Sequence, residues 1–315
     1  MTSTSSAPDE GKKRQAVEDD WRIPPTRRFP RAPRALREAG HFARKGLGQH
    51  FLRDRRILQR IVRAAKLSPD DTVVEVGAGL GTLTALLAKR AARVVAVEVD
   101  EELCDHLRQR FAETPNLSLV CADVLSLTPS QLLREAGASP PYVVVANLPY
   151  YIAAPVLRFF LEATAPPSRL VVMVQKEVAE SIVAGPGKTS LLGMSVQFYA
   201  SPRLLFTVPP SAFYPPPKVQ SAVLRLDVRA RPAVEVEDTG GFFRFVRAGF
   251  SAPRKQLRNA LSHALGASAP HVAATIAEAG VDPRVRAQAL GLEDWARLYG
   301  AFSASGLHKS GGTAR

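Results

Sequence analysis

The sequence contains very little cysteine. Its 315 residues include two cysteines, Cys104 and Cys121, and they form no CxxC pattern. Structural zinc sites and disulfide-stapled folds need more cysteines or closer pairs of them. We therefore expect neither a metal site nor a disulfide framework, and we interpret both residues as buried or half-buried free thiols.

Long apolar runs are also missing. No stretch approaches the roughly 20 consecutive apolar residues of a membrane-spanning helix. The first residues, MTSTSSAPDEGKKRQ, are polar and lack the apolar centre of a signal peptide. These two absences predict a soluble, cytoplasmic protein that does not associate with a membrane.

Acidic residues are outnumbered by basic ones. The chain has 42 Lys and Arg against 29 Asp and Glu, which gives a formal net charge of +13 and a pI near 10.2. A basic protein attracts polyanions, because binding releases the counterions that surround them. The excess favours a nucleic-acid partner, although a solubility feature or a basic tail on a neutral enzyme would give the same charge.

The N-terminal 45 residues are rich in Ser, Pro and charge and have few periodic apolar positions. This composition predicts a disordered basic extension over residues 1–45. Its arginine-dense part, WRIPPTRRFPRAPRALREAGHFARKG, is either a nucleic-acid-binding arm or a solvated tail. The residues alone leave both possibilities open.

Regular structure is expected from about residue 54 onward. Short apolar runs alternate with segments of helical period, which is typical of a parallel sheet covered by helices on both faces. We predict an α/β domain over residues 46–230, with further strands and turns from Met194 to Leu226. The composition shifts around residues 229 to 240. We therefore predict a small helical domain over residues 231–302 and a frayed tail over residues 303–315.

The run VVEVGAGLGTLT reads as a strand, a glycine turn and a helix. Gly77, Gly79 and Gly81 allow a tight turn and a close approach of the backbone to a ligand. The spacing is G-x-G-x-G, so it does not match the G-x-G-x-x-G fingerprint of dinucleotide sites. Glu98 ends the next strand and suits a ribose diol, while Asp123 ends the third and suits an adenine amine. An adenosine-bearing cofactor without phosphates fits these residues better than NAD.

The fourth strand, YVVVANLPY, ends in Asn147-Leu148-Pro149-Tyr150 beside the predicted cofactor site. The Asn147 side-chain oxygen and the Leu148 carbonyl can each accept one hydrogen of an exocyclic amine. Pro149 favours an extended backbone, and Tyr150 offers a flat face on which a base can stack. The lone pair of the amine is then directed at an electrophile.

Several motifs together resemble the ribosomal RNA adenine dimethyltransferases. They are GLGQHFL (46–52), VVEVGAGLGTLT (73–84), VANLPYYIAAP (145–155), MVQKEVAESIVAGPG (173–187), FYPPPKVQSAVLRL (213–226) and FSAPRKQLRNAL (250–261). The resemblance covers roughly residues 46–300. It implies a Rossmann-like S-adenosylmethionine-dependent methyltransferase domain with a small C-terminal helical domain.

The resemblance also implies roles for individual residues. S-adenosylmethionine would be bound by His50, Leu52, Gly77, Gly79, Glu98, Asp123 and Asn147. The target adenine would be held by Asn147, Leu148, Pro149 and Tyr150, with Phe213 packing on the other face of the base. A basic group of Arg254, Lys255 and Arg258, expected within about one helical turn, would grip phosphates.

The members that this chain resembles most dimethylate two adjacent adenosines in a hairpin near the 3′ end of 16S rRNA, in the small ribosomal subunit. We expect a monomeric enzyme of that kind, with a role in ribosome biogenesis. A 23S rRNA adenine methyltransferase of the antibiotic-resistance type shares the same motifs and remains an alternative. A non-catalytic RNA-binding assembly factor is a second alternative, and a nicotinamide oxidoreductase is a distant third.

Overall fold

A computed structural model describes residue 46 and residues 48–306 of the chain, so the predictions for residues 1–45 and for residues 307–315 fall outside it. Its centre is a seven-stranded sheet with the order β4-β3-β2-β5-β6-β9-β7. The strands are β2 (Thr72–Val76), β3 (Arg93–Glu98), β4 (Leu117–Cys121), β5 (Tyr142–Asn147), β6 (Arg169–Gln175), β7 (Ala200–Val208) and β9 (Ser221–Val228).

The five strands from β4 to β6 are parallel, as the apolar runs predicted. β9 then pairs antiparallel with β6, and β7 pairs antiparallel with β9. A second, two-stranded sheet joins β1 (Phe51–Leu52) to β8 (Phe213–Tyr214). The alternation of strands and helices in a largely parallel sheet confirms the Rossmann-like α/β fold.

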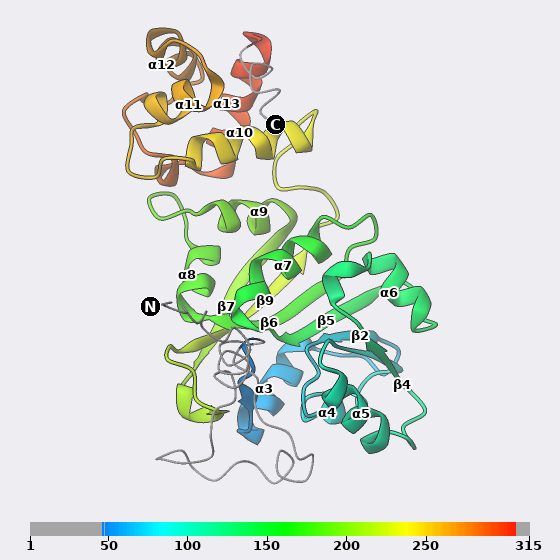
Figure 1. Ribbon diagram of the computed structural model, residues 1–315. Helices are drawn as coiled ribbons and strands as arrows, with labels where there is room; N and C mark the ends of the chain where they lie inside the picture. Colours follow the sequence, from blue (N-terminus) through cyan, green and yellow to red (C-terminus); the bar gives the residue numbers. More distant parts are fainter. Residues whose placement is uncertain (1–45, 47, 307–315) are drawn as a thin grey trace, which may run out of the picture.

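Alternate residues of each strand point to opposite faces of the sheet, and both faces are buried. In β2, Val74 and Val76 join one apolar core while Val73 joins the other. Helices cover both faces (Figure 1). They are α3 (Arg55–Ala65), α4 (Thr84–Leu87), α5 (Glu101–Arg110), α6 (Pro129–Glu135), α7 (Ala153–Leu161) and α8 (Lys176–Val183).

The C-terminal part is helical, as predicted, and lies beyond α9 in Figure 1. It comprises α10 (Thr239–Phe250), α11 (Leu257–Leu265), α12 (Ala269–Glu278) and α13 (Leu292–Ala304), so helical structure continues slightly past the expected start of the tail. These helices pack around the fully buried Trp295. No helix within residues 46–306 is long and apolar enough to cross a membrane.

The prediction of strands and turns from Met194 was wrong for its first six residues. Residues Leu191–Tyr199 form helix α9, whose first turn is capped by the Ser190 hydroxyl accepting from the Gly193 N–H at 3.0 Å. The sequence LLGMSVQFY shows no helical period because α9 is buried on several sides. Val196 packs into the sheet core, whereas Met194 and Phe198 pack into the core of the C-terminal helices.

The prediction of two free thiols was also wrong. Cys104 in α5 and Cys121 at the end of β4 form a disulfide, with their Cα atoms 6.1 Å apart. The two residues are separated by 17 positions in sequence. They meet because α5 packs against the neighbouring β4 after the chain crosses over from β3. The separation of the two cysteines in the sequence does not by itself predict this disulfide.

Glu75 is a buried carboxyl group that the apolar pattern of β2 conceals. It is 1% exposed, and its Oε2 atom has no hydrogen-bond partner among the described residues. Burial raises the pKa of Glu75 from 4.5 to about 8, and the nearby Glu98 adds to this rise while polar groups of Thr84 partly offset it. At neutral pH the folded protein therefore keeps Glu75 protonated.

This raised pKa makes stability depend on pH. Between pH 4.5 and about 8 the unfolded chain releases this proton and the folded chain keeps it, so the contribution of Glu75 to stability falls as pH rises. We expect Glu75→Gln, which cannot ionise, to stabilise the protein by about 3 kcal/mol at pH 8 and by little at pH 5. Urea unfolding at both pH values measures this difference.

The exposed Glu135→Gln in α6 serves as the matched control for this prediction. It removes the same charge from the surface and should change stability by less than about 0.5 kcal/mol at either pH. Equal effects of Glu75→Gln at pH 5 and pH 8 would contradict the assignment of a protonated, buried Glu75.

Candidate active site

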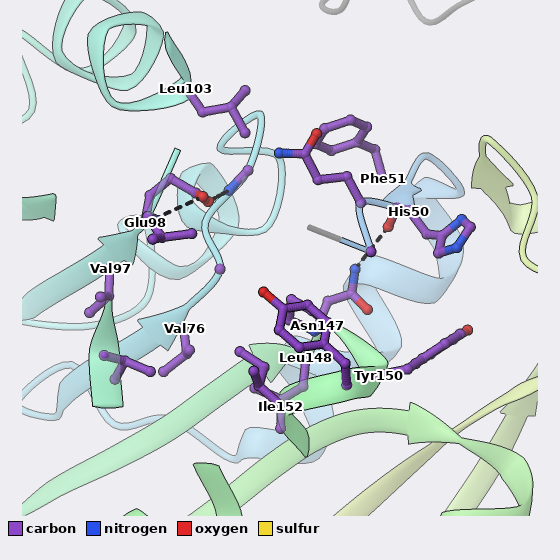
Figure 2. Close-up of a pocket in the computed structure, with 18 of the residues that line it drawn as sticks. His50, Phe51, Val76, Val97, Glu98, Leu103, Asn147, Leu148, Tyr150 and Ile152 are labelled. Atoms are coloured by element: carbon purple, nitrogen blue, oxygen red, sulfur yellow. Dashed lines mark hydrogen bonds between the residues drawn. The ribbon is translucent and has the colours of Figure 1, made fainter. Parts of the chain in front are cut away.

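A pocket opens at the carboxyl ends of the parallel strands (Figure 2). The strand order reverses between β2 and β5, and open α/β sheets bind ligands at such a point. The pocket is lined by the ends of β2, β3 and β5, by the segments after β4 and β5, and by residues 48–51. Predicted site residues that line it are His50, Gly77, Gly79, Glu98, Asp123, Asn147, Leu148, Pro149, Tyr150 and Phe213.

The glycine loop follows β2 and forms one wall of the pocket. Gly77, Gly79 and Gly81 all have positive φ, at 74°, 57° and 70°. A side chain at any of these positions would strain the backbone. The loop also lies close to the end of β5, since a Cβ atom on Gly77 would be 3.7 Å from the Asn147 carbonyl oxygen. The turn thus brings bare backbone beside the Asn-Leu-Pro-Tyr motif.

Glu98 ends β3 and lies under the glycine loop. Its Oε2 accepts from the Gly79 N–H at 2.8 Å, and its Oε1 accepts from the N–H groups of Val99 and Asp100 at 3.0 and 3.1 Å. Burial raises the pKa of Glu98, and these three N–H donors partly offset that rise. A carboxylate offers about four acceptor positions, so capacity remains for hydroxyl donors from a ligand.

Asp123 follows β4 at the rim of the pocket and is exposed. Its Oδ1 accepts from the Leu125 N–H at 3.0 Å and caps a short 3-10 turn, η2 (Val124–Ser126). This contact fixes the direction of the carboxylate while the side chain remains accessible. Glu98 and Asp123 thus present carboxylates from adjacent strand ends to one pocket.

Residues 48–51 line one side of the pocket, where the pairing of β1 with β8 holds them. Phe51 lines the pocket, and its ring lies 3.3 Å from the position that a Cβ on Gly79 would take. Leu52 was predicted to bind the cofactor, but the structure places it in the core, 5% exposed and outside the pocket lining. Successive residues of a strand point to opposite sides, so Phe51 takes the position expected of Leu52.

Asn147 is the last residue of β5. Its Nδ2 donates to the His50 carbonyl at 3.2 Å, which leaves the side-chain oxygen as an acceptor on the pocket side (Figure 2). The Leu148 N–H donates to the Met173 carbonyl of β6 at 3.2 Å, and the Leu148 side chain is buried. Leu148 lines the pocket, and its carbonyl remains the group that the motif predicts to accept from a ligand. Pro149 is extended, with φ −55° and ψ 133°.

Tyr150 begins the short 3-10 turn η3 (Tyr150–Ile152) and is half-buried. Burial raises the pKa of its phenol, which is therefore neutral at physiological pH. Its ring centroid is 5.9 Å from that of His50. The His50 Nδ1 lies 2.7 Å from the Pro215 carbonyl, so this nitrogen carries the proton and donates. The two rings thus come from segments that the sequence separates by about a hundred residues.

Phe213 in β8 lines the pocket but is 2% exposed, and it belongs to the same apolar core as Leu52, its partner in the two-stranded sheet. Tyr151, by contrast, is 57% exposed at the rim and was not among the predicted site residues. Of these three aromatic residues, Tyr150 and Tyr151 are therefore more accessible to a ligand than Phe213.

The basic group expected on one helical turn lies mostly in a loop. α10 ends at Phe250 and α11 begins at Leu257, so Arg254 and Lys255 are exposed loop residues and Arg258 lies in the first turn of α11. Pro253 cannot extend the helix before it, which explains the break. The Arg258 Nε donates to the Gln256 Oε1 at 3.1 Å. All three residues lie outside the pocket.

The chain matches the family model described as "Ribosomal RNA adenine dimethylase" over residues 40–303. A relative from Dehalococcoides mccartyi, named "Ribosomal RNA small subunit methyltransferase A", is 49% identical over 256 residues, which cover 81% of this chain and 87% of the relative. A protein of the same name from Moorella thermoacetica is 44% identical over 84% of this chain and 93% of its own.

Solved structures agree with these matches. The 23S rRNA methyltransferase ErmE is 30% identical with a TM-score of 0.63, over 80% of this chain and 99% of that one. A dimethyladenosine transferase from Plasmodium falciparum gives a TM-score of 0.67 at 24% identity, over 82% and 98% of the two chains, and shows the same fold. The chain therefore belongs to the ribosomal RNA adenine dimethylase family.

Proposed function

We propose that this protein transfers two methyl groups from S-adenosylmethionine to N6 of each of two adjacent adenosines in a hairpin near the 3′ end of 16S rRNA. The observation that carries the proposal is the position of Asn147. Its amide stands at the end of β5, between the glycine loop and the aromatic ring of Tyr150, and it is fixed by the His50 carbonyl. A family of rRNA adenine dimethylases supplies the substrate class.

The cofactor half of the pocket fits an adenosine with no phosphate. Gly77 and Gly79 let the backbone approach the ligand, Glu98 is placed to accept from ribose hydroxyls, and Asp123 is placed to accept from the adenine amine. When bound, S-adenosylmethionine supplies an electrophilic methyl group on a sulfonium. Two carboxylates near that site favour a cationic ligand.

The target half of the pocket suits an exocyclic amine. The Asn147 Oδ1 and the Leu148 carbonyl accept its two hydrogens and turn its lone pair toward the methyl group. Tyr150 stacks on the base, which must leave its helix at a cost of a few kcal/mol. The amine needs no general base before attack, because the product cation is acidic. The protein therefore acts mainly through position and fixed polar groups.

The choice of small-subunit RNA rests on the relatives that carry "small subunit" in their names, at up to 49% identity. ErmE, whose title names 23S rRNA, is 30% identical and supports the second candidate, a methyltransferase of large-subunit RNA. In either case three positively charged residues outside the pocket are suited to bind phosphates and so to position the RNA, namely Arg254, Lys255 and Arg258. We propose that the enzyme acts as a monomer in the cytoplasm, without a metal.

The test is to incubate the protein with methyl-labelled S-adenosylmethionine and either small or large undermethylated ribosomal subunits. We expect N6,N6-dimethyladenosine in small-subunit RNA, at two adjacent positions near its 3′ end. Label confined to the large subunit would support the second candidate function, methylation of large-subunit RNA. Label in neither subunit, with cofactor still bound, would overturn both.

A further inference from the structure

Ser221 is a buried hydroxyl that the roles assigned so far do not use. It is the first residue of β9, is 0% exposed, and lies outside the pocket lining. In the sheet it pairs with Gln175 of β6 on one side and with Val208 of β7 on the other. Its backbone is therefore held by two neighbouring strands, so its Cβ atom occupies a fixed position.

The hydroxyl of Ser221 lies 2.7 Å from the phenol oxygen of Tyr150, and either oxygen can donate. A buried polar side chain is tolerated when it is hydrogen-bonded, and among the described residues Tyr150 is the partner of this one. The contact joins positions 71 residues apart. It links the rigid sheet to a side chain at the pocket.

Tyr150 is thereby held at both ends. The turn η3 fixes its backbone directly after Pro149, and Ser221 fixes its phenol oxygen. Cβ and Oη lie on one axis through the ring, so these two anchors fix the position of that axis and keep the ring from swinging about the Cα–Cβ bond. Stacking of a base is favoured when the ring already lies in the receiving position, because an unanchored ring has to be ordered at the moment of binding.

We propose that Ser221 is a positioning residue for methyl transfer, which acts by holding the Tyr150 ring in the place where it receives the target adenine. The inference rests on the proposed function. Ser221 itself touches neither the base nor the cofactor. Its removal therefore changes the reaction of bound RNA and leaves cofactor binding as it was.

The test is a double-mutant cycle of Ser221→Ala, Tyr150→Phe and the double variant. For each protein, kcat and KM are measured on undermethylated small subunits, and the cofactor Kd is measured by calorimetry. We expect each single variant to lower kcat/KM about tenfold, which corresponds to one lost hydrogen bond. The double variant should be no slower than the slower single variant, because both changes remove the same contact.

Two further variants separate positioning from general damage. Ser221→Thr keeps the hydroxyl and should restore most of the activity lost in Ser221→Ala. Ser201→Ala removes an exposed hydroxyl from the edge strand β7 and should leave kcat/KM unchanged. An unchanged cofactor Kd in Ser221→Ala shows that the pocket is still folded.

The outcomes distinguish this inference from the proposed function. Additive losses in the cycle, or wild-type kcat/KM in Ser221→Ala, overturn the inference while the proposed function stands. A loss that appears as weaker cofactor binding also overturns it, since that result would mean a disturbed pocket. A wild-type protein that methylates neither subunit overturns both.

Discussion

Asn147→Ala is expected to lower kcat for methyl transfer to rRNA by about 10²- to 10³-fold, the range found when one preorganised polar contact is removed from a reacting group. The variant loses the acceptor that orients the adenine amine. It also leaves the His50 carbonyl without the Asn147 Nδ2 donor, so the segment that crosses the pocket is less firmly held. Single-turnover methylation with preformed enzyme and RNA measures the loss directly.

The controls for Asn147 use one matched site and one conservative change. Asn259→Ala removes an exposed amide from α11, far from the pocket in sequence and fold, and should keep full activity. Asn147→Asp keeps an acceptor but loses the donor to His50, so an intermediate rate is expected. A normal kcat for Asn147→Ala would show that Asn147 does not take part in methyl transfer.

Gly81→Ala is expected to destabilise the protein by about 3 kcal/mol. Gly81 has φ +70°, and a Cβ atom there would lie 2.5 Å from the Phe111 ring and 2.8 Å from Leu107. The left-handed backbone costs an alanine about 1 kcal/mol and crowding in a packed core adds about 2 kcal/mol. Urea unfolding of wild type and variant gives the difference in free energy.

Gly266→Ala is the matched control, because it separates the two causes. Gly266 has φ +64° at the end of α11, and nothing lies within 4 Å of an added Cβ. We expect this substitution to cost about 1 kcal/mol, which is the backbone share alone. If the two substitutions destabilise equally, the contact of Gly81 with α5 carries no weight.

Much of the site was predictable because its residues follow strands. Gly77, Glu98, Asp123 and Asn147 each come directly after or at the end of an apolar run, and the ends of parallel strands meet at one edge. The position of each of these residues at the end of a strand is therefore enough to predict that their side chains and backbone lie close together. The residue types then suggest the ligand, since carboxylates suit a diol or an amine and an amide beside an aromatic ring suits a base.

The remaining features depend on contacts between distant segments. Phe51 and not Leu52 lines the pocket, because the pairing of β1 with β8 sets which side of the strand faces inward. The bond between Ser221 and Tyr150 joins residues 71 positions apart, and a serine at the start of an apolar strand gives no sign of it. Cys104 and Cys121 meet only through the crossover after β3.

Helix α9 has a consequence for the exchange of parts between relatives. Met194 and Phe198 belong to the core of α10–α13, although they precede β7 and β9 of the sheet in sequence. A chimaera spliced at residue 231 would therefore join foreign C-terminal helices to a native α9, and the large Phe198 side chain would meet a surface shaped for another residue. Grafting residues 191–199 together with the C-terminal helices keeps this interface intact. Chimaeric proteins should therefore exchange the two segments together.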